Sequence, residues 1–260
     1  FYCSMVPAST ATGLLVGSLF ATFMFNTWGA TSDFVVDWGW RIPFLLSSVL
    51  VFLGLWIRKD IDETPDFQKV KASGQVAKAP LRDTLKHHWR EVLIAAGLKV
   101  VETAPFYIFS TFVVSYATST LTYQKSQALE AVTLGALVAT IMIPLMGLLS
   151  DKVGRQRMYA ISVFVLGLFI VPWFMLLNTG TTWGIVLATV IAFGVLWAPV
   201  TAVLGTLCSE IFSANVRYTG ITLGYQLGAA LAGGTAPLIA TGLLAKYDGD
   251  WVPVAWDLAV

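Results

Sequence analysis

The stretch that decides the fold is VLIAAGLKVVETAPFYIFSTFVVSYA, residues 92–117. About twenty mostly apolar residues are enough to cross a bilayer as a helix. Lys99 and Glu102 lie inside this stretch, roughly a third to a half of the way across. A charged side chain at that depth costs several kcal/mol unless it faces a protein-lined or hydrated interior. The stretch therefore predicts a membrane-spanning helix beside a transport route, with Lys99 and Glu102 as the first candidates for a substrate or proton site.

The composition of the whole chain is typical of a membrane protein. Of its 260 residues, 57% are hydrophobic and 12% are charged, whereas soluble domains carry about 25% charged residues. Ten Trp and eight Tyr suit a protein with two membrane–water interfaces. The net charge of +1 gives no indication of a nucleic-acid partner. Cys3 and Cys208 lack any metal-binding spacing, and we interpret them as small packing residues.

Seven apolar stretches are candidates for membrane spans, and an eighth begins near Val252. The second stretch is short, and the sequence leaves open whether its helix begins before Trp40. The chain starts beside one apolar stretch and stops within another, so we expect an internal fragment of a longer membrane protein. The seven stretches are Met5 to Thr27, Ile42 to Ile57, Val92 to Ala117, Ala128 to Leu149, Met158 to Asn178, Thr182 to Leu207, and Thr219 to Leu244.

Basic residues predict the orientation of these spans. The one long polar segment, Arg58 to Glu91, has the composition of a linker. Twelve of the sixteen Lys and Arg residues fall on its side of the membrane, and only Arg41, Lys125 and Lys246 fall on the other. Cytoplasmic loops are enriched in Lys and Arg. The linker is therefore expected to be cytoplasmic.

Glycine spacing indicates where helices pack closely. Gly13 and Gly17 form one G-x-x-x-G pair, and Gly220, Gly224 and Gly228 form two in tandem. Small residues at this spacing let two helix backbones approach each other. We expect close packing above all at the three glycines in register.

The most distinctive motif is GLLSDKVGRQR, residues 147–157, in the loop after the fourth span. Gly154 allows a sharp turn, and Asp151 can either cap the next helix or pair with an arginine of the loop. The pattern resembles the loop signature of the major facilitator superfamily. The flanking segments WGWRIPF (38–44) and ETPDFQ (63–68), with Glu210 and Arg217, resemble the metabolite:proton symporter family within it.

This resemblance implies the fold and the domain boundaries. The chain would be an all-α membrane protein with a partial major facilitator fold. Residues 1–57 would be the last two helices of the N-terminal bundle, 58–91 the central cytoplasmic linker, and 92–260 the C-terminal bundle, truncated in its last helix. The chain would then need the missing N-terminal helices of the same protein, and alone it would not transport. Sugar porters, the nearest competing group, usually show a different linker motif.

The resemblance also implies roles for individual residues. Lys99 would attract a substrate carboxylate, while Glu102 would bind a proton or hold Lys99 in place; the alternative is a structural pair that locks the helix to a neighbour. Tyr107 and Gln226, like Tyr225 and Tyr116, are candidate cavity residues or ordinary packing. On the cytoplasmic side, Glu210 and Arg217 would form ion pairs with the 147–157 loop that help to hold the outward-facing state; the alternative is an inert surface role. The members of that gate motif are Gly147, Asp151, Lys152, Gly154, Arg155, Arg157, Glu210 and Arg217.

The function expected from these features is proton-coupled symport of a small organic metabolite, a carboxylate or a zwitterion, across the bacterial cytoplasmic membrane. The alternatives are a helical bundle without coupled transport, channel-like or receptor-like, and a sugar-porter-type facilitator. The sequence has no phosphate-binding loop and no nucleophile–base pattern, so we expect neither ATP-driven transport nor an enzyme. We expect no cofactor and no metal: adjacent His87 and His88 point in different directions on a helix and suit an interfacial segment.

Overall fold

The computed structural model describes residues 1–29, 32–59, 68, 80–213 and 216–259, and these are helical apart from short turns. Most of the predicted linker lies outside the described residues. The first part of the chain contains a short turn and two long helices joined by a π-helical turn. Their bounds are η1 Tyr2–Ser4, α1 Met5–Trp28, η2 Val35–Gly39 and α2 Arg41–Arg58.

The second part begins with the short helix α4 and continues through five long helical rods to α12. Two of these rods contain a π-helical turn in the middle, η3 or η4. The bounds are α4 Pro80–His87, α5 Trp89–Tyr107, η3 Ile108–Phe112, α6 Val113–Ser119, α7 Lys125–Val153, α8 Arg155–Leu177, α9 Thr182–Thr189, η4 Val190–Leu196, α10 Trp197–Ile211, α11 Arg217–Lys246 and α12 Val252–Ala259.

All seven predicted spans are confirmed as helices. Within the described residues, seven helical segments are long and apolar enough to cross a membrane, and each overlaps one predicted stretch. The short second stretch gains its length at its start, because the apolar helical segment runs from Val35 to Ile57. The chain is therefore a multi-pass membrane protein.

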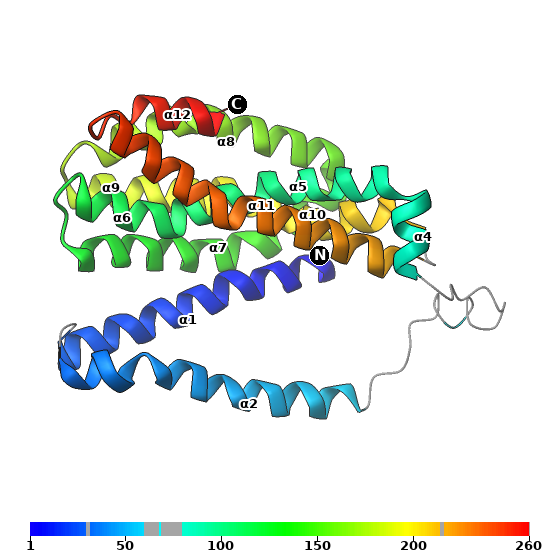
Figure 1. Ribbon diagram of the computed structural model, residues 1–260, viewed down its shortest axis with the longest axis horizontal. Coiled ribbons are helices and arrows are strands. Elements are labelled where there is room, and N and C mark those ends of the chain that lie inside the picture. Colours follow the sequence, from blue (N-terminus) through cyan, green and yellow to red (C-terminus); the bar gives the residue numbers. More distant parts are fainter. Residues whose placement is uncertain (30–31, 60–67, 69–79, 214–215, 260) are drawn as a thin grey trace.

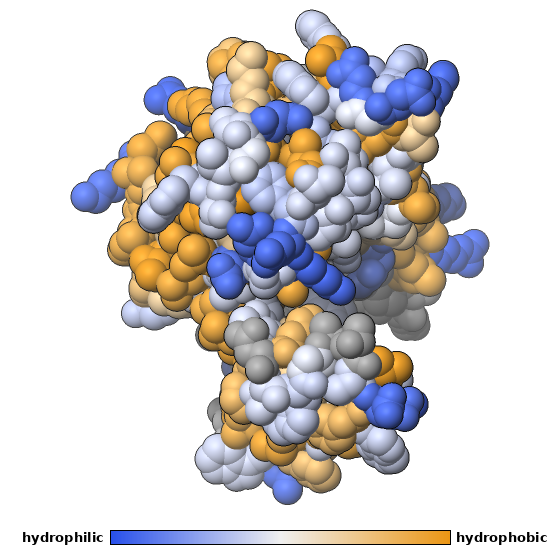
Figure 2. Space-filling view, turned by 90° about the vertical axis from the view of Figure 1, so that its left-hand side faces the viewer, coloured by the Kyte–Doolittle hydropathy of each residue, from blue (hydrophilic) through white to orange (hydrophobic). Residues whose placement is uncertain are grey.

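The rods run side by side, and most of them form one packed group (Figure 1). Within that group α11 packs along α5, and α10 packs on both α7 and α8. Helix α1 lies against α7, whereas α2 stands apart from the group and contacts η2 at the α1–α2 turn. In Figure 2, seen from that end, hydrophobic side chains cover the flanks and hydrophilic ones gather on the end. This distribution suits lipid on the flanks and water at the end.

Glycines bring α11 against α5 as the tandem spacing predicted. A Cβ atom placed on Gly224 would lie 2.6 Å from the Cβ of Ala95, and one on Gly228 would lie 2.5 Å from the backbone oxygen of Ala96. Neither position has room for a side chain. Gly13 and Gly17 differ, because a Cβ atom there would meet no atom of the described chain within 4 Å.

Aromatic side chains fill the centre of the packed group. Trp173, Trp197, Phe109 and Phe193 are fully buried. Phe193 stacks obliquely on Trp197 with ring centroids 5.1 Å apart, and Phe109 meets Trp173 edge-on at 5.1 Å. The Phe109–Trp173 contact joins the rod that contains η3 to α8. Phe106 of α5 packs on both Phe193 and Trp197, which joins the two rods that line the adjacent cavity.

Candidate functional site

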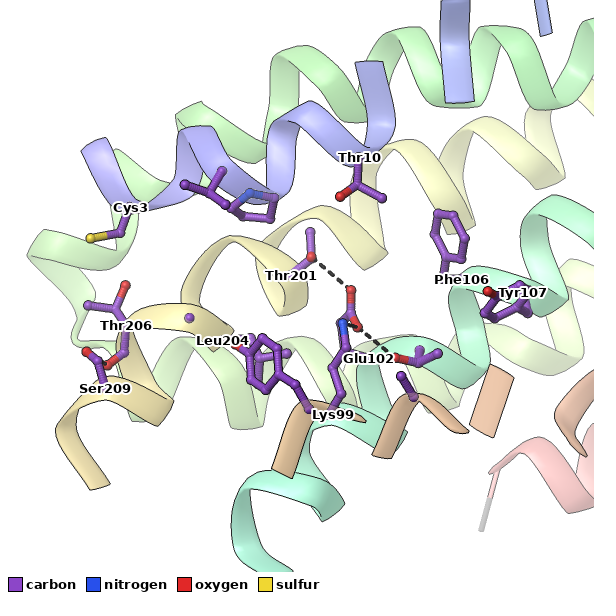
Figure 3. Close-up of a pocket in the computed structure, with 16 residues that line it drawn as sticks. Cys3, Thr10, Lys99, Glu102, Phe106, Tyr107, Thr201, Leu204, Thr206 and Ser209 are labelled. Atoms are coloured by element: carbon purple, nitrogen blue, oxygen red, sulfur yellow. Dashed lines mark hydrogen bonds and ion pairs between the residues drawn. The ribbon is translucent and has the colours of Figure 1, made fainter. Parts of the chain in front are cut away.

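A cavity of about 540 Å³ opens between the start of α1 and three helices of the packed group, α5, α10 and α11. Figure 3 shows the side chains that converge on it. Helix α5 contributes Lys99, Glu102 and Tyr107 to the wall, and α10 contributes Thr201. Much of the remaining lining is apolar, with Val6 and Pro7 on the α1 side. An apolar pocket with a few convergent polar groups is the usual form of a small-molecule site.

Lys99 and Glu102 form an ion pair in the wall of this cavity. The lysine Nζ lies 2.5 Å from Oε2 of the glutamate, one turn away on α5. The Glu102 side chain is 7% exposed, whereas that of Lys99 is 20% exposed. The sequence placed both charges at membrane depth on one helix face, and the structure brings them to the same cavity.

The Glu102 carboxylate is held by more than its lysine. Thr103 donates its hydroxyl to Oε2 at 3.0 Å, and Thr201 donates its hydroxyl to Oε1 at 3.0 Å, from α10. The indole N–H of Trp197 also donates to the main-chain oxygen of Glu102 at 2.9 Å. Buried carboxylates are tolerated when hydrogen bonds and a counter-charge replace water. Glu102 therefore joins α5 to α10.

Lys99 is less constrained than its partner. Its ammonium lies 5.2 Å from the ring centroid of Tyr225, a cation–π contact from α11. A lysine ammonium has three N–H donors, and Glu102 accepts one of them in this structure. Lys99 lines the cavity, and its ammonium keeps N–H donors that Glu102 does not accept.

Tyr107 lines the same cavity, although a straight helix would turn it about 140° away from Glu102. The side chain of Tyr107 points in nearly the same direction as that of Thr103, which is one turn earlier on α5 and also lines the cavity. The ring of Tyr107 packs against Gly233 of α11, where a Cβ atom would approach the ring to within 2.8 Å. Phe106 covers the same end, with its ring 5.3 Å from that of Trp197.

The expectation for Gln226 is corrected by the structure. Its side chain is exposed and is not part of the cavity wall. Tyr225 and Ala229, which are four residues apart on α11, line the cavity instead. Successive residues on a helix point about 100° apart, so a shift of one position moves Gln226 off this face. Tyr116 is buried away from this cavity, and its hydroxyl meets the side chain of Asn178.

Sequence reasoning missed the two threonines that hold Glu102. Thr103 and Thr201 lie in apolar helices, where most threonine hydroxyls bond to their own backbone. Thr12, Thr118 and Thr133 do so in this chain. Nothing in the local sequence separates the two classes, since the acceptor of Thr201 lies on another helix.

The loop motif 147–157 forms a separate charged cluster at the end of the bundle. Arg155 lies 3.8 Å from Asp151 and forms an ion pair with Glu210 of α10. Asp151 therefore pairs within the loop, while Gly154 occupies the N-cap position of α8 with a φ of +94°. A Cβ atom on Gly147 would overlap the side chain of Ser4, so this glycine lets η1 approach α7.

The remaining cations of the motif do not join this cluster. Lys152 and Arg157 are exposed, and within the described part of the chain neither forms an ion pair. Arg217 was expected to pair with the loop, but its Nε donates to the main-chain oxygen of Phe212 at 3.3 Å. The expectation fails for Arg217 because its side chain closes the turn before α11, five residues from Phe212.

Comparison with known proteins identifies the family. The sequence profile of the Major Facilitator Superfamily matches residues 1–251. The chain belongs to the major facilitator superfamily. The shikimate transporter of Escherichia coli (strain K12) is 30% identical over 98% of this chain and 58% of its own length. The ectoine/proline transporter ProP of Corynebacterium glutamicum is 30% identical over 88% of this chain and 47% of its own length.

The chain spans about half the length of the curated major facilitator relatives it matches. A further relative, the proline/betaine transporter of Escherichia coli (strain K12), is 28% identical over 86% of this chain and 46% of its own length. No solved structure matches the chain. Because the relatives are named as transporters and not as enzymes, the superfamily assignment agrees with the expectation of a membrane transport protein.

Proposed function

We propose that the protein acts as a secondary active transporter, which couples proton entry to uptake of a small metabolite that carries a carboxylate. The observation that carries the proposal is the Lys99–Glu102 pair in the wall of a cavity between four membrane helices. The names of the relatives, which include shikimate and proline/betaine transporters, point to the same class of substrate. All of these substrates are small organic molecules with a carboxylate.

Coupling follows from charge balance at the pair. In this structure one ammonium faces one carboxylate. A ligand carboxylate bound to Lys99 would place two anions beside one cation in a low-dielectric site, where like charges repel strongly. Protonation of Glu102 removes one of these anions. For a substrate with a single negative charge, the site then has the same net charge with substrate and proton bound as it has when empty, so the two are carried together.

A second role for Glu102 is compatible with symport. The carboxylate, tied to α10 by Thr201, would hold Lys99 at the cavity while another group carries the proton. In either role the anionic part of the substrate binds Lys99. The aromatic side chains of Tyr225 and Phe106 would cover the rest of the molecule.

The remaining parts of the chain take the positions that this function requires. Under the proposal, α1 and α2 are the last helices of the first bundle, residues 58–91 form a cytoplasmic linker, and residues 92–260 belong to the second bundle. The missing N-terminal helices of the longer protein would complete the cavity beside α1. The Arg155–Glu210 pair, with its neighbours in the 147–157 loop, would close the cytoplasmic side in the outward-facing state.

Uptake into proteoliposomes tests the proposal. The full-length protein is reconstituted, and uptake of labelled dicarboxylates, ring acids such as shikimate, and zwitterions such as betaine is measured with and without an inward proton gradient. At least one carboxylate should enter faster with the gradient, and an uncoupler should remove the difference. If uptake is saturable but indifferent to the gradient and the uncoupler, the protein is a facilitator and the coupling proposal is wrong.

A further inference from the structure

The short helix α4 lies crosswise at the end of the bundle, just before the spanning helix α5 begins (Figure 1). It contacts α5 and α11. Thr84 is fully buried and marks the side of α4 that faces the bundle. Because α4 ends at His87 and α5 starts at Trp89, the chain turns there from an orientation along the membrane surface into the bilayer.

The sides of α4 that do not face the bundle carry two different rows of side chains. Leu81 and Leu85 are 54% and 51% exposed and lie one turn apart. Arg82 and Lys86 form a second exposed row, also one turn apart. On a helix these rows are about 100° apart, so an apolar edge runs parallel to a cationic edge. In the part of the chain that the structure describes, neither Arg82 nor Lys86 forms an ion pair.

The first turns of α5 mark the level of the membrane boundary. Trp89 is exposed with the guanidinium of Arg90 5.4 Å from its ring centroid, and tryptophan is enriched at membrane–water interfaces. Leu93 and Ile94 follow one turn later and are exposed apolar residues of a membrane-spanning helix. Helix α4, which directly precedes these residues, therefore lies next to the headgroup region.

We propose that α4 binds anionic phospholipid headgroups of the adjacent leaflet. Leu81 and Leu85 enter the boundary between headgroups and acyl chains, while Arg82 and Lys86 bind the phosphate groups. Arginine matches a phosphate with two parallel N–H bonds and lysine binds it as a point charge. Basic amphipathic segments beside a membrane helix attract anionic lipids in this way. The inference requires only that the chain spans a membrane, so it is independent of the proposed transport function.

Lipid selectivity of the reconstituted full-length protein tests this site. Spin-labelled phosphatidylglycerol and phosphatidylcholine are compared for their association with the protein by electron paramagnetic resonance. The wild type should prefer phosphatidylglycerol. The double variant Arg82→Gln/Lys86→Gln should lose that preference by about fivefold or more, because the apolar edge of α4 holds these two cations in the headgroup region, where a cation contributes about that factor.

A matched control removes the same charge elsewhere. Lys125→Gln/Lys246→Gln changes two exposed lysines at the other end of the spans and should leave the preference near the wild-type value. An unchanged preference in the α4 variant, or an equal loss in both variants, would overturn the proposal. If the double variant does not fold, the two single variants decide, because each should lose part of the preference. Binding of an acidic soluble peptide to α4 that leaves the preference for phosphatidylglycerol unchanged would also overturn the proposal.

Discussion

Lys99 and Glu102 are neighbours in the same cavity wall, but they are held to very different degrees. The carboxylate of Glu102 accepts hydroxyl hydrogen bonds from Thr103 and Thr201 in addition to the lysine. The ammonium of Lys99 has the carboxylate and the face of one tyrosine ring. The carboxylate is therefore the fixed member of the pair. The ammonium of Lys99 is the less constrained and more exposed member, and the proposed function assigns it the substrate carboxylate.

Thr201→Val should destabilise the protein through Glu102. The change keeps the shape of the side chain but removes a hydrogen bond to a buried carboxylate, which is worth about 1.5–3 kcal/mol for a charged acceptor. We expect a lower thermal unfolding temperature for the detergent-solubilised protein. Thr206→Val is the matched control, because Thr206 lines the same cavity and its hydroxyl forms no hydrogen bond within the described residues. Equal stability of the two variants would contradict the role of Thr201.

Gly228→Ala should separate α11 from α5. An added Cβ would come within 2.5 Å of the Ala96 backbone oxygen and 2.7 Å of the Lys99 Cβ. Overpacking of this kind costs about 1–3 kcal/mol, and the displaced lysine should also weaken substrate binding. Thermal unfolding and the apparent affinity for substrate measure the two effects.

Gly234→Ala serves as the control for that prediction on the same helix. Its added Cβ meets no atom of the residues that the structure describes within 4 Å, and alanine is favoured over glycine in a helix by about 1 kcal/mol. This variant should be as stable as the wild type or more so. A Gly228→Ala protein that behaves like Gly234→Ala would show that the close approach of α11 to α5 is not required.

Reversal of the Arg155–Glu210 pair should change turnover more than stability. Both side chains are partly exposed, and exposed ion pairs contribute only about 0–1 kcal/mol to folding. Arg155→Glu should slow uptake at saturating substrate while the apparent affinity stays near normal, and the second change Glu210→Arg should restore part of the rate. Lys152→Glu makes the same charge change in the same loop without breaking a described ion pair. If it slows uptake equally, the effect belongs to the charge of the loop and not to the pair.

The sequence predicted the spans well because the length of an apolar stretch is a local property. The second span shows where this prediction is less accurate. Its helical segment begins at Val35, before Trp40, where polar and apolar residues are mixed and a search for apolar stretches does not detect the helix. The charges that flank the third span also predict a depth for Lys99 and Glu102, and that depth stays a prediction. The sequence does not show which faces of the helices meet. Helix α11 is apolar or glycine-rich around its whole circumference, so nothing in its pattern distinguishes Tyr225 from Gln226.

The sequence also does not identify the hydrogen-bond partners that a side chain finds on other helices. The hydroxyl of Thr201 meets Glu102 only because α10 packs beside α5 at that level. Arg217 shows the opposite case. The charge pattern assigned its side chain to a distant loop, but the side chain donates to the nearby main-chain oxygen of Phe212. Gly13 and Gly17 have the spacing of a packing motif, but no atom of the described residues lies within 4 Å of a Cβ placed on either. Spacing predicts that a close approach is possible and does not identify the neighbour.

Uptake by the double variant Lys99→Gln/Glu102→Gln tests the central claim most directly. Two neutral amides of similar size avoid the unpaired buried charge that either single change would leave, so folding and abundance are expected to stay near wild type. If the pair binds substrate and proton, gradient-driven uptake per molecule of the full-length protein should fall more than about tenfold, equivalent to about 1.4 kcal/mol. Wild-type uptake per molecule would contradict the account and leave the pair as a structural link between helices.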